Sequence, residues 1–293
     1  AASVLRALGD GKTPLLAMVV AAVTNIVLDL VFVMGTEMGV MGAALATVIA
    51  QFLSVVYCVL HIRKIRILRL TREDFYMKKE LNLRLLYLGM PMAFQNIVIS
   101  VGGMIVQTVV NGFGVIFIAG FTATNKLYGL LETAATSYGY AITTYTGQNV
   151  GAGKYSRISR GMRAGILISM ATSLMIAALM LIFGKWILSC FITAEGQEGI
   201  GALKVAYRYL AIMSVFLPIL YILHVTRSCI QGMGNTVLPM VSGLAEFFMR
   251  TGTALLFTLL LGSDGIFFAE ILAWLGADLI LVPGYFWMRR SLG

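Results

Sequence analysis

Long apolar stretches alternate with short polar ones along the whole chain. Each apolar stretch reaches about 20 residues, the length that an α-helix needs to cross a hydrocarbon core of about 30 Å. The most uniform stretch, AGILISMATSLMIAALMLIFG (164–184), contains no charged residue. The pattern predicts eight membrane-spanning helices, over residues 14–34, 39–60, 85–110, 115–146, 164–189, 205–225, 237–262 and 265–288. We therefore expect an all-α polytopic membrane protein.

Two of these predicted helices have features that disturb a regular helix. Pro91 lies inside the helix predicted over 85–110, and the helix predicted over 115–146 is longer than one crossing requires. Proline has no backbone N–H and is a common cause of kinks. A kink or an internal break is therefore expected in both helices.

Composition supports the membrane interpretation and removes one class of partner. Hydrophobic residues make up 59% of the chain and charged residues 12%, whereas soluble domains have about 25% charged residues. The net charge is +9, but a nucleic-acid-binding domain gathers its basic residues on one solvated face. Here they fall between apolar stretches, so a lipid bilayer is the expected partner and nucleic acid is not.

The positions of the basic residues predict the orientation in the membrane. They are densest in residues 61–84 and 153–163, and short cytoplasmic loops are enriched in Lys and Arg. The connection over 61–84 and the loop over 147–163 are therefore predicted to be cytoplasmic, in a multi-pass protein of the inner (plasma) membrane. Arg6, Lys12, Arg227, Arg289 and Arg290 are predicted on the same side. Glu37, Asn111, Glu195 and Asp264 are predicted on the opposite side.

The glycine-rich segment GQNVGAGKY (147–155) does not fit a phosphate-binding loop. A Walker A loop requires glycine where the chain has Gln148, and Ser or Thr where it has Tyr155. We interpret the segment as a tight turn between two helices. The three cysteines and two histidines lack the spacing of a metal site. Without a catalytic motif, the chain is predicted to be a non-enzyme that has no cofactor and no metal.

An internal repeat relates the start of the chain to its end. LRALGDGKTPLL (5–16) resembles IQGMGNTVLPMV (230–241), and MGVMGAALA (38–46) resembles DGIFFAEIL (264–272). Secondary transporters often contain such repeats. The last two helices are therefore predicted to repeat the first two. If the last six helices form one repeat, the first copy lacks its opening four helices.

The chain resembles the multidrug and toxic compound extrusion (MATE) transporters. The resemblance rests on LRALGDGKTPL (5–15), TNIVLDLVF (24–32), MGVMGAALATVIAQ (38–51), LGMPMAFQN (88–96), TGQNVGAGKYSR (146–157) and IQGMGNTVLPM (230–240). It implies twelve helices in two six-helix lobes. Residues 1–60 would be the last two helices of the N-terminal lobe, 61–80 the cytoplasmic interlobe linker, and 81–293 the complete C-terminal lobe. The chain is then expected to be an incomplete fragment whose missing N-terminal helices are its partner.

The resemblance also implies a cation- or proton-binding site. Asn25 and Asp29 lie four residues apart and hence on one helix face, and they match an Asn and an Asp of the family's fifth helix. Thr47 matches a Thr of the sixth. The acidic partner that the family has in its first helix lies outside this chain. The alternative is that Asp29 and Asn25 serve helix packing.

Five further polar residues in apolar segments are candidates for a substrate cleft. Four of them are ionisable, and an ionisable group at membrane depth is costly without a partner or a function. The fifth is a glutamine that could hydrogen-bond a substrate. The five are Gln95, Lys126, Glu132, Glu246 and Arg250. For Glu246 and Arg250, four residues apart, a local ion pair is the favoured interpretation. Gln95 serves equally well as a partner for a carbonyl freed by Pro91. Glu270 and Asp278 are expected to serve interhelical packing.

The resemblance implies a secondary active antiporter that exports cationic amphipathic compounds in exchange for Na⁺ or H⁺. Two alternatives stay open at this point. One is a lipid-linked sugar flippase of the same superfamily, which would be expected to have a more cationic cavity. The other is a membrane structural or partner protein that does not transport.

Overall fold

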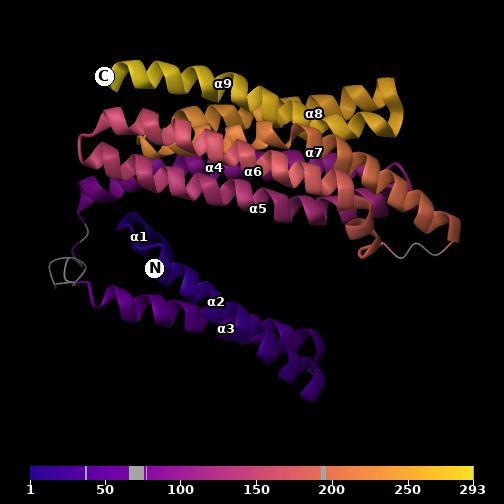
Figure 1. Cartoon of the computed structure of the whole chain (residues 1–293), viewed down its shortest axis with the longest axis horizontal. Helices are drawn as coiled ribbons and strands as arrows, with labels where there is room; N and C mark the ends of the chain where they lie inside the picture. The colour runs from indigo at the N-terminus through magenta and orange to yellow at the C-terminus, as the bar shows by residue number, and fades with distance from the viewer. Residues whose placement is uncertain (37, 66–75, 77, 193–195, 293) are drawn as a thin grey trace. The chain divides into compact units, whose positions relative to one another are not determined.

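The structure, a computed structural model, describes residues 1–36, 38–65, 76, 78–192 and 196–292. In these residues helices are joined by short turns, and no strand is present (Figure 1). The chain divides into two compact units, Ala1–Leu81 and Asn82–Gly293.

The first unit is a helical hairpin preceded by one short helix, α1 (Ala2–Ala7). Its first long helix, α2 (Lys12–Asp29), continues as a π-helix, η1 (Leu30–Gly35), and α3 (Gly39–Ile62) packs against both. Small buried residues recur every four positions on the two helices, which lets their backbones approach closely. They are Ala17 and Ala21 on α2, and Gly42, Ala46 and Ala50 on α3.

The second unit contains six long helices in its described part. They are α4 (Lys79–Asn111), α5 (Val115–Gly151), α6 (Tyr155–Ser189), α7 (Gly196–Gly232), α8 (Val237–Leu261) and α9 (Ala269–Leu292), with a 3₁₀ segment, η4 (Gly262–Phe268), before α9. α7 packs against α5, α6 and α9. Its fully buried side chains, including Tyr209 and Tyr221, lie in the core of this unit.

The seam between α5 and α7 is held by close backbone contact and by hydrogen bonds. At Gly120, an added Cβ would lie 2.5 Å from the carbonyl oxygen of Ala202 on α7. Thr124 Oγ1, one turn along α5, donates to the carbonyl of Ala206 at 2.9 Å. Small residues and hydroxyl donors are the groups that hold helices together in lipid, where burial of apolar side chains gives no net drive.

All eight predicted helices form, but several are longer than their apolar stretches. The helix predicted over 205–225 extends over Gly196–Gly232, and the helix predicted over 164–189 begins at Tyr155. The reason is that the helical backbone continues through polar turns beyond the hydrocarbon core. Neither helix has an internal break, since α4 runs through Pro91 and α5 is a single helix of 37 residues. A kink in either helix stays a prediction.

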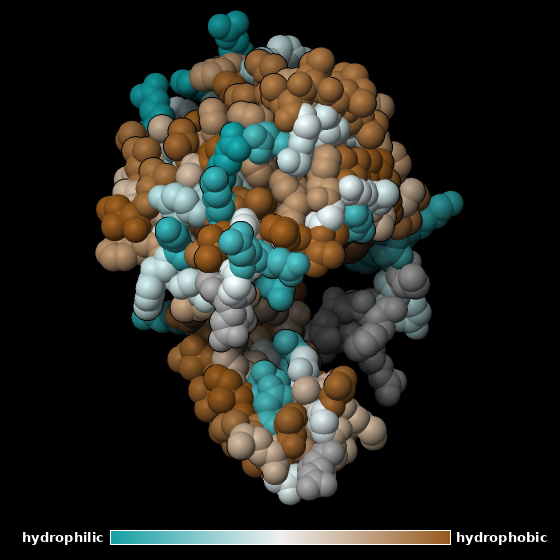
Figure 2. Space-filling model, turned by 90° about the vertical axis from the view of Figure 1, so that its right-hand side faces the viewer, coloured by the Kyte–Doolittle hydropathy of each residue, from teal (hydrophilic) through white to brown (hydrophobic). Residues whose placement is uncertain are grey.

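Six stretches of the described residues are long and apolar enough to cross a membrane. They are Lys12–Gly35, Gly39–Ile62, Lys79–Asn111, Tyr155–Ser189, Gly196–Gly232 and Val237–Arg290, of which the last contains both α8 and α9. Large apolar side chains stay exposed on their outer faces, for example Leu259 at 83% and Leu167 at 69%. Figure 2 shows such residues, in brown, over much of the surface in view. This surface suits contact with a lipid bilayer.

The segment GQNVGAGKY forms the predicted turn between α5 and α6. Gly153 has φ +68°, a conformation that favours glycine. Its N–H donates to the carbonyl of Val150 at 3.0 Å, and the N–H of Lys154 donates to the carbonyl of Asn149 at 2.8 Å. These two bonds form a Schellman motif, which satisfies the last carbonyls of α5.

The internal repeat corresponds to one local structure that occurs twice. Gly9 and Gly234 each end a helix with positive φ, at +89° and +85°. Asp10 and Asn235 follow them, and each accepts a hydrogen bond at 3.0 Å on its Oδ1 from the backbone N–H three residues later. The matched residues therefore terminate one helix and begin the next in both copies.

The ends of the second unit differ in charge. The α5–α6 turn and the C-terminal end of α9 lie at one end of the bundle, and the α8–α9 turn lies at the other (Figure 1). The basic segment 153–163 and Arg289 and Arg290 thus share one end, as the predicted topology requires. Which end faces the cytoplasm stays a prediction, and Glu37 and Glu195 lie outside the described residues.

Candidate functional site

The first unit brings two of the three predicted cation-site residues into contact. Asn25 on α2 donates through Nδ2 to Thr47 Oγ1 on α3 at 3.3 Å. Thr47 Oγ1 in turn donates to the carbonyl of Ala43 at 3.0 Å. The hydroxyl is therefore oriented by its own helix and presents its lone pairs toward α2. This bond is a polar link between the two helices of a largely apolar hairpin.

Asp29, the third residue, lies one turn beyond Asn25 at the end of α2. Its Oδ1 is buried and accepts no hydrogen bond from the described residues. The helix changes to π geometry directly after it, at Leu30, and π-helical turns occur frequently at functional sites. A buried carboxylate oxygen without a donor is costly, so the position is suited to a proton or a bound cation.

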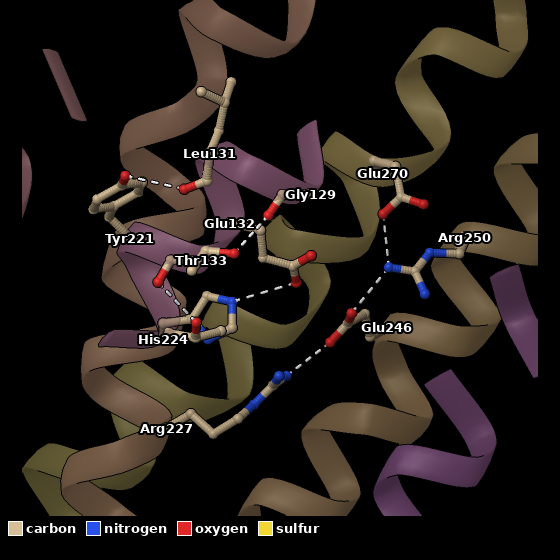
Figure 3. Close-up of polar contacts among 11 residues, drawn as sticks. Gly129, Leu131, Glu132, Thr133, Tyr221, His224, Arg227, Glu246, Arg250 and Glu270 are labelled. Atoms are coloured by element: carbon tan, nitrogen blue, oxygen red, sulfur yellow. Dashed lines mark hydrogen bonds and ion pairs between the residues drawn. The ribbon is translucent and has the colours of Figure 1, made fainter. Parts of the chain in front are cut away.

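The second unit holds a chain of four buried charged residues on α7, α8 and α9 (Figure 3). Arg227 Nη2 contacts Glu246 Oε2 at 2.7 Å, and Arg250 Nη2 contacts Glu246 Oε1 at 3.0 Å and Glu270 Oε2 at 2.7 Å. The four side chains are between 6% and 17% exposed. We call Arg227, Glu246, Arg250 and Glu270 the buried ion network.

The buried ion network also reaches α4. Arg250 Nη1 donates to the carbonyl of Ile99 at 3.2 Å. Gly102, almost one turn further along α4, lies beside the same side chain, since an added Cβ would be in van der Waals contact with Arg250 Cδ at 3.5 Å. The network therefore ties four helices together, and its two cations balance its two carboxylates.

Arg227 is a buried helical residue, although it lies beyond the helix predicted over 205–225. The residue lies inside α7, and its side chain is only 11% exposed. The apolar run ends near residue 225, so the sequence suggested that the helix ends there. The Schellman glycine at Gly234 was the signal that the helix continues, and this continuation turns Arg227 toward Glu246 on α8.

The other cleft candidates lie apart from one another. Gln95 is buried on α4 and packs against Gly243 on α8, where an added Cβ would lie 2.7 Å from its Cγ. Lys126 is exposed and lines a pocket between α5 and α7. Glu132 lies 3.7 Å from His224 Nε2, and its side chain is 41% exposed. Of the acidic candidates, Glu132 is therefore far more accessible to a cation than Glu246.

Comparison with known sequences identifies the family. The sequence model of the MatE family matches residues 91–256, more than half of the chain. The chain belongs to the MatE family. The matched range lies within the second unit and runs from α4 to α8, so it includes Gln95 and most of the buried ion network.

Named relatives of this MatE chain are longer than it is. It is 30% identical over 265 residues to the probable multidrug resistance protein YpnP of Bacillus subtilis, which covers 90% of this chain and 58% of that protein. It is 26% identical over 250 residues to the probable multidrug resistance protein NorM of Thermotoga maritima, covering 82% and 51%. The chain thus spans between half and three fifths of these relatives.

Solved structures show the same fold. A crystal structure of a Vibrio cholerae MATE transporter superposes with a TM-score of 0.89 at 19% identity, covering 98% of this chain and 65% of that one. An outward-facing multidrug resistance MATE family transporter gives 0.86 at 22% identity, covering 98% and 64%. At these identities the likeness concerns the fold alone. The predicted family and fold class are confirmed.

Proposed function

We propose that this MatE chain is part of a secondary active antiporter that exports cationic amphipathic drugs or toxins in exchange for Na⁺ or H⁺. Two relatives carry the name of probable multidrug resistance proteins. The longer length of the relatives supports a partner in the form of further helices. Alternating access requires a second body for the unit to move against.

The observation that carries this proposal is the polar group in the first unit. Asn25 and Thr47 are joined across the hairpin, and Asp29 has a buried oxygen that the described residues leave without a donor. An antiporter needs a carboxylate that exchanges its occupant. Oxygen ligands such as these are the ones that a hard cation prefers, and a proton on Asp29 would satisfy the same oxygen.

The experiment measures occupancy of this group directly. The purified chain is unfolded by heat in detergent, in Na⁺ against choline at equal ionic strength and over a series of pH values. Any bound ion stabilises the folded state by mass action. If Na⁺ is the coupling ion, we expect Asp29→Asn to abolish the stabilisation by Na⁺. If H⁺ is, we expect the same variant to abolish the pH dependence of the melting temperature. Thr47→Val should weaken the stabilisation by Na⁺.

Two matched variants serve as controls. Asp278→Asn removes the charge of another partly buried aspartate whose Oδ1 lacks a donor among the described residues, and Thr24→Val removes a hydroxyl from α2 outside the group. Both should keep the stabilisation by Na⁺. Ethidium efflux from cells that express the gene, driven by Na⁺ or H⁺, tests the transport step. An ion response or efflux that survives Asp29→Asn unchanged would sink the assignment.

A further inference from the structure

The basic end of the second unit contains a pocket that the transport proposal does not use. It has a volume of about 450 Å³ and lies between the start of α6, the α7–α8 turn and the end of α9. Sites for small ligands have volumes of about 300–1,000 Å³. We call it the basic pocket, and it is lined by Arg160, Arg163 and Arg289 together with Ser156, Ser159 and Tyr285.

The charge of the basic pocket is not balanced from within. No acidic residue lines it, and its three arginines form no ion pair with the described residues. The start of α6 adds to the positive potential, because its first turn contains no acidic residue and its N-cap, Lys154, makes no capping bond through its side chain. Free N–H groups and the helix dipole both favour an anion there.

The pocket lies at the depth of a lipid headgroup. The basic residues at the start of α6 end at Arg163, and the charge-free run covers residues 164–184. On α9, Phe286 and Trp287 are exposed by 51% and 70% just before Arg289. Exposed aromatic residues of this kind mark the boundary between hydrocarbon and headgroups. A phospholipid whose phosphate lay in the pocket would therefore have its acyl chains beside the apolar parts of α6 and α9.

We propose that the basic pocket binds the phosphate of an anionic phospholipid. Arginine forks match phosphate oxygens in a bidentate way, the serine hydroxyls donate further hydrogen bonds, and Ile158 and Met233 form an apolar wall for the glycerol. The pocket lies at the end that the basic residues predict to be cytoplasmic, where the leaflet carries anionic lipids. This site is independent of ion exchange at Asp29, so either proposal can fail alone.

The test uses the purified chain in detergent and native mass spectrometry, with phosphatidylglycerol and phosphatidylcholine added together. We expect selective retention of phosphatidylglycerol. Arg163→Gln and Arg289→Gln should each weaken it about fivefold, the change that about 1 kcal/mol per basic residue near an anionic surface produces. Arg289→Lys should retain most of the binding. Arg290→Gln and Arg157→Gln, neighbours that do not line the pocket, should change it less than twofold.

Two measurements on the unaltered chain keep the test independent of how the variants fold. Dioleoylglycerol, which lacks the phosphate, should not displace phosphatidylglycerol, whereas phosphatidic acid should. Inorganic phosphate can compete for the same arginines, so it is added at the concentration at which phosphatidylglycerol binds. Displacement of phosphatidylglycerol at that concentration would show a site for free phosphate and overturn the lipid assignment. Equal retention of the two phospholipids, or equal losses in the pocket variants and their neighbours, would also overturn it.

Discussion

Removing Arg250 should destabilise the second unit more than removing Arg227, although both arginines contact Glu246. Arg227 is joined to the network through Glu246 alone, and Glu246 keeps Arg250 when Arg227 is lost. Arg250 is the only ion-pair partner of Glu270 among the described residues. The variant Arg250→Met therefore leaves a carboxylate with 17% exposure uncompensated in a low dielectric.

The expected magnitudes follow from this difference. Breaking a buried pair by deleting one partner costs about 3–5 kcal/mol, so Arg250→Met should lower the free energy of unfolding by that amount. Losing a hydrogen bond between charged groups costs about 1.5–3 kcal/mol, which is the expectation for Arg227→Met, because both carboxylates stay in contact with Arg250. Adding Glu270→Gln to Arg250→Met should recover stability, because it removes the unpaired carboxylate.

The assay is unfolding in mixed micelles, with the sodium dodecyl sulfate fraction as denaturant and circular dichroism as the signal. Arg208→Met is the matched control, since Arg208 contacts Asp264 at 2.7 Å but the side chains are 59% and 41% exposed. Such a surface pair is worth about 0–1 kcal/mol. Equal losses for the Arg250 and Arg227 variants, or a further loss on adding Glu270→Gln, would refute the reasoning.

Two further predictions concern backbone contact and pH. Gly120→Ala should cost about 1–3 kcal/mol through overpacking against α7, while Gly129→Ala, with nothing within 4 Å of the new Cβ, should be neutral or slightly stabilising in the same assay. The hydrogen bond from the Thr13 hydroxyl, followed by that from the Thr13 N–H, lowers the pKa of Asp10. Its stabilising charge is thus present above the unfolded pKa and lost as pH falls through the lower folded pKa. The difference in melting temperature between the unaltered chain and Asp10→Asn should close over that window, and a difference independent of pH would contradict it.

The helices of this chain could be predicted because lipid imposes a strong rule on sequence. A spanning segment must satisfy its backbone internally and be apolar over a fixed length, so a charge-free run such as 164–184 identifies α6 directly. Helix ends are less constrained. α6 starts nine residues before that run, at Tyr155, because its first turns are polar and lie outside the hydrocarbon core.

The candidate sites were partly predictable for the same reason. A pair four residues apart, such as Glu246 and Arg250, meets on one helix face whatever the fold, and the structure shows this pair. Contacts between helices depend on rotation and register, which spacing along one helix does not encode. The link from Arg227 to Glu246 is of this kind. The basic pocket is another example, because it is lined by both Arg163 and Arg289, which lie more than 100 residues apart in sequence.

The control Asp278→Asn tests whether any partly buried aspartate without a hydrogen-bond donor would respond to ions as Asp29 is expected to. The two aspartates differ in the groups that surround them. Each has an Oδ1 without a donor among the described residues. Among the described residues, Asp278 has no amide or hydroxyl hydrogen-bonded beside it as Asn25 and Thr47 are beside Asp29. In the first unit, Asp29 has an amide and a hydroxyl on the same hairpin and no cation paired with it among the described residues. The exchanged ion should therefore bind at Asp29, so a Na⁺ response that Asp278→Asn abolishes and Asp29→Asn spares would place the exchanging site in the second unit instead.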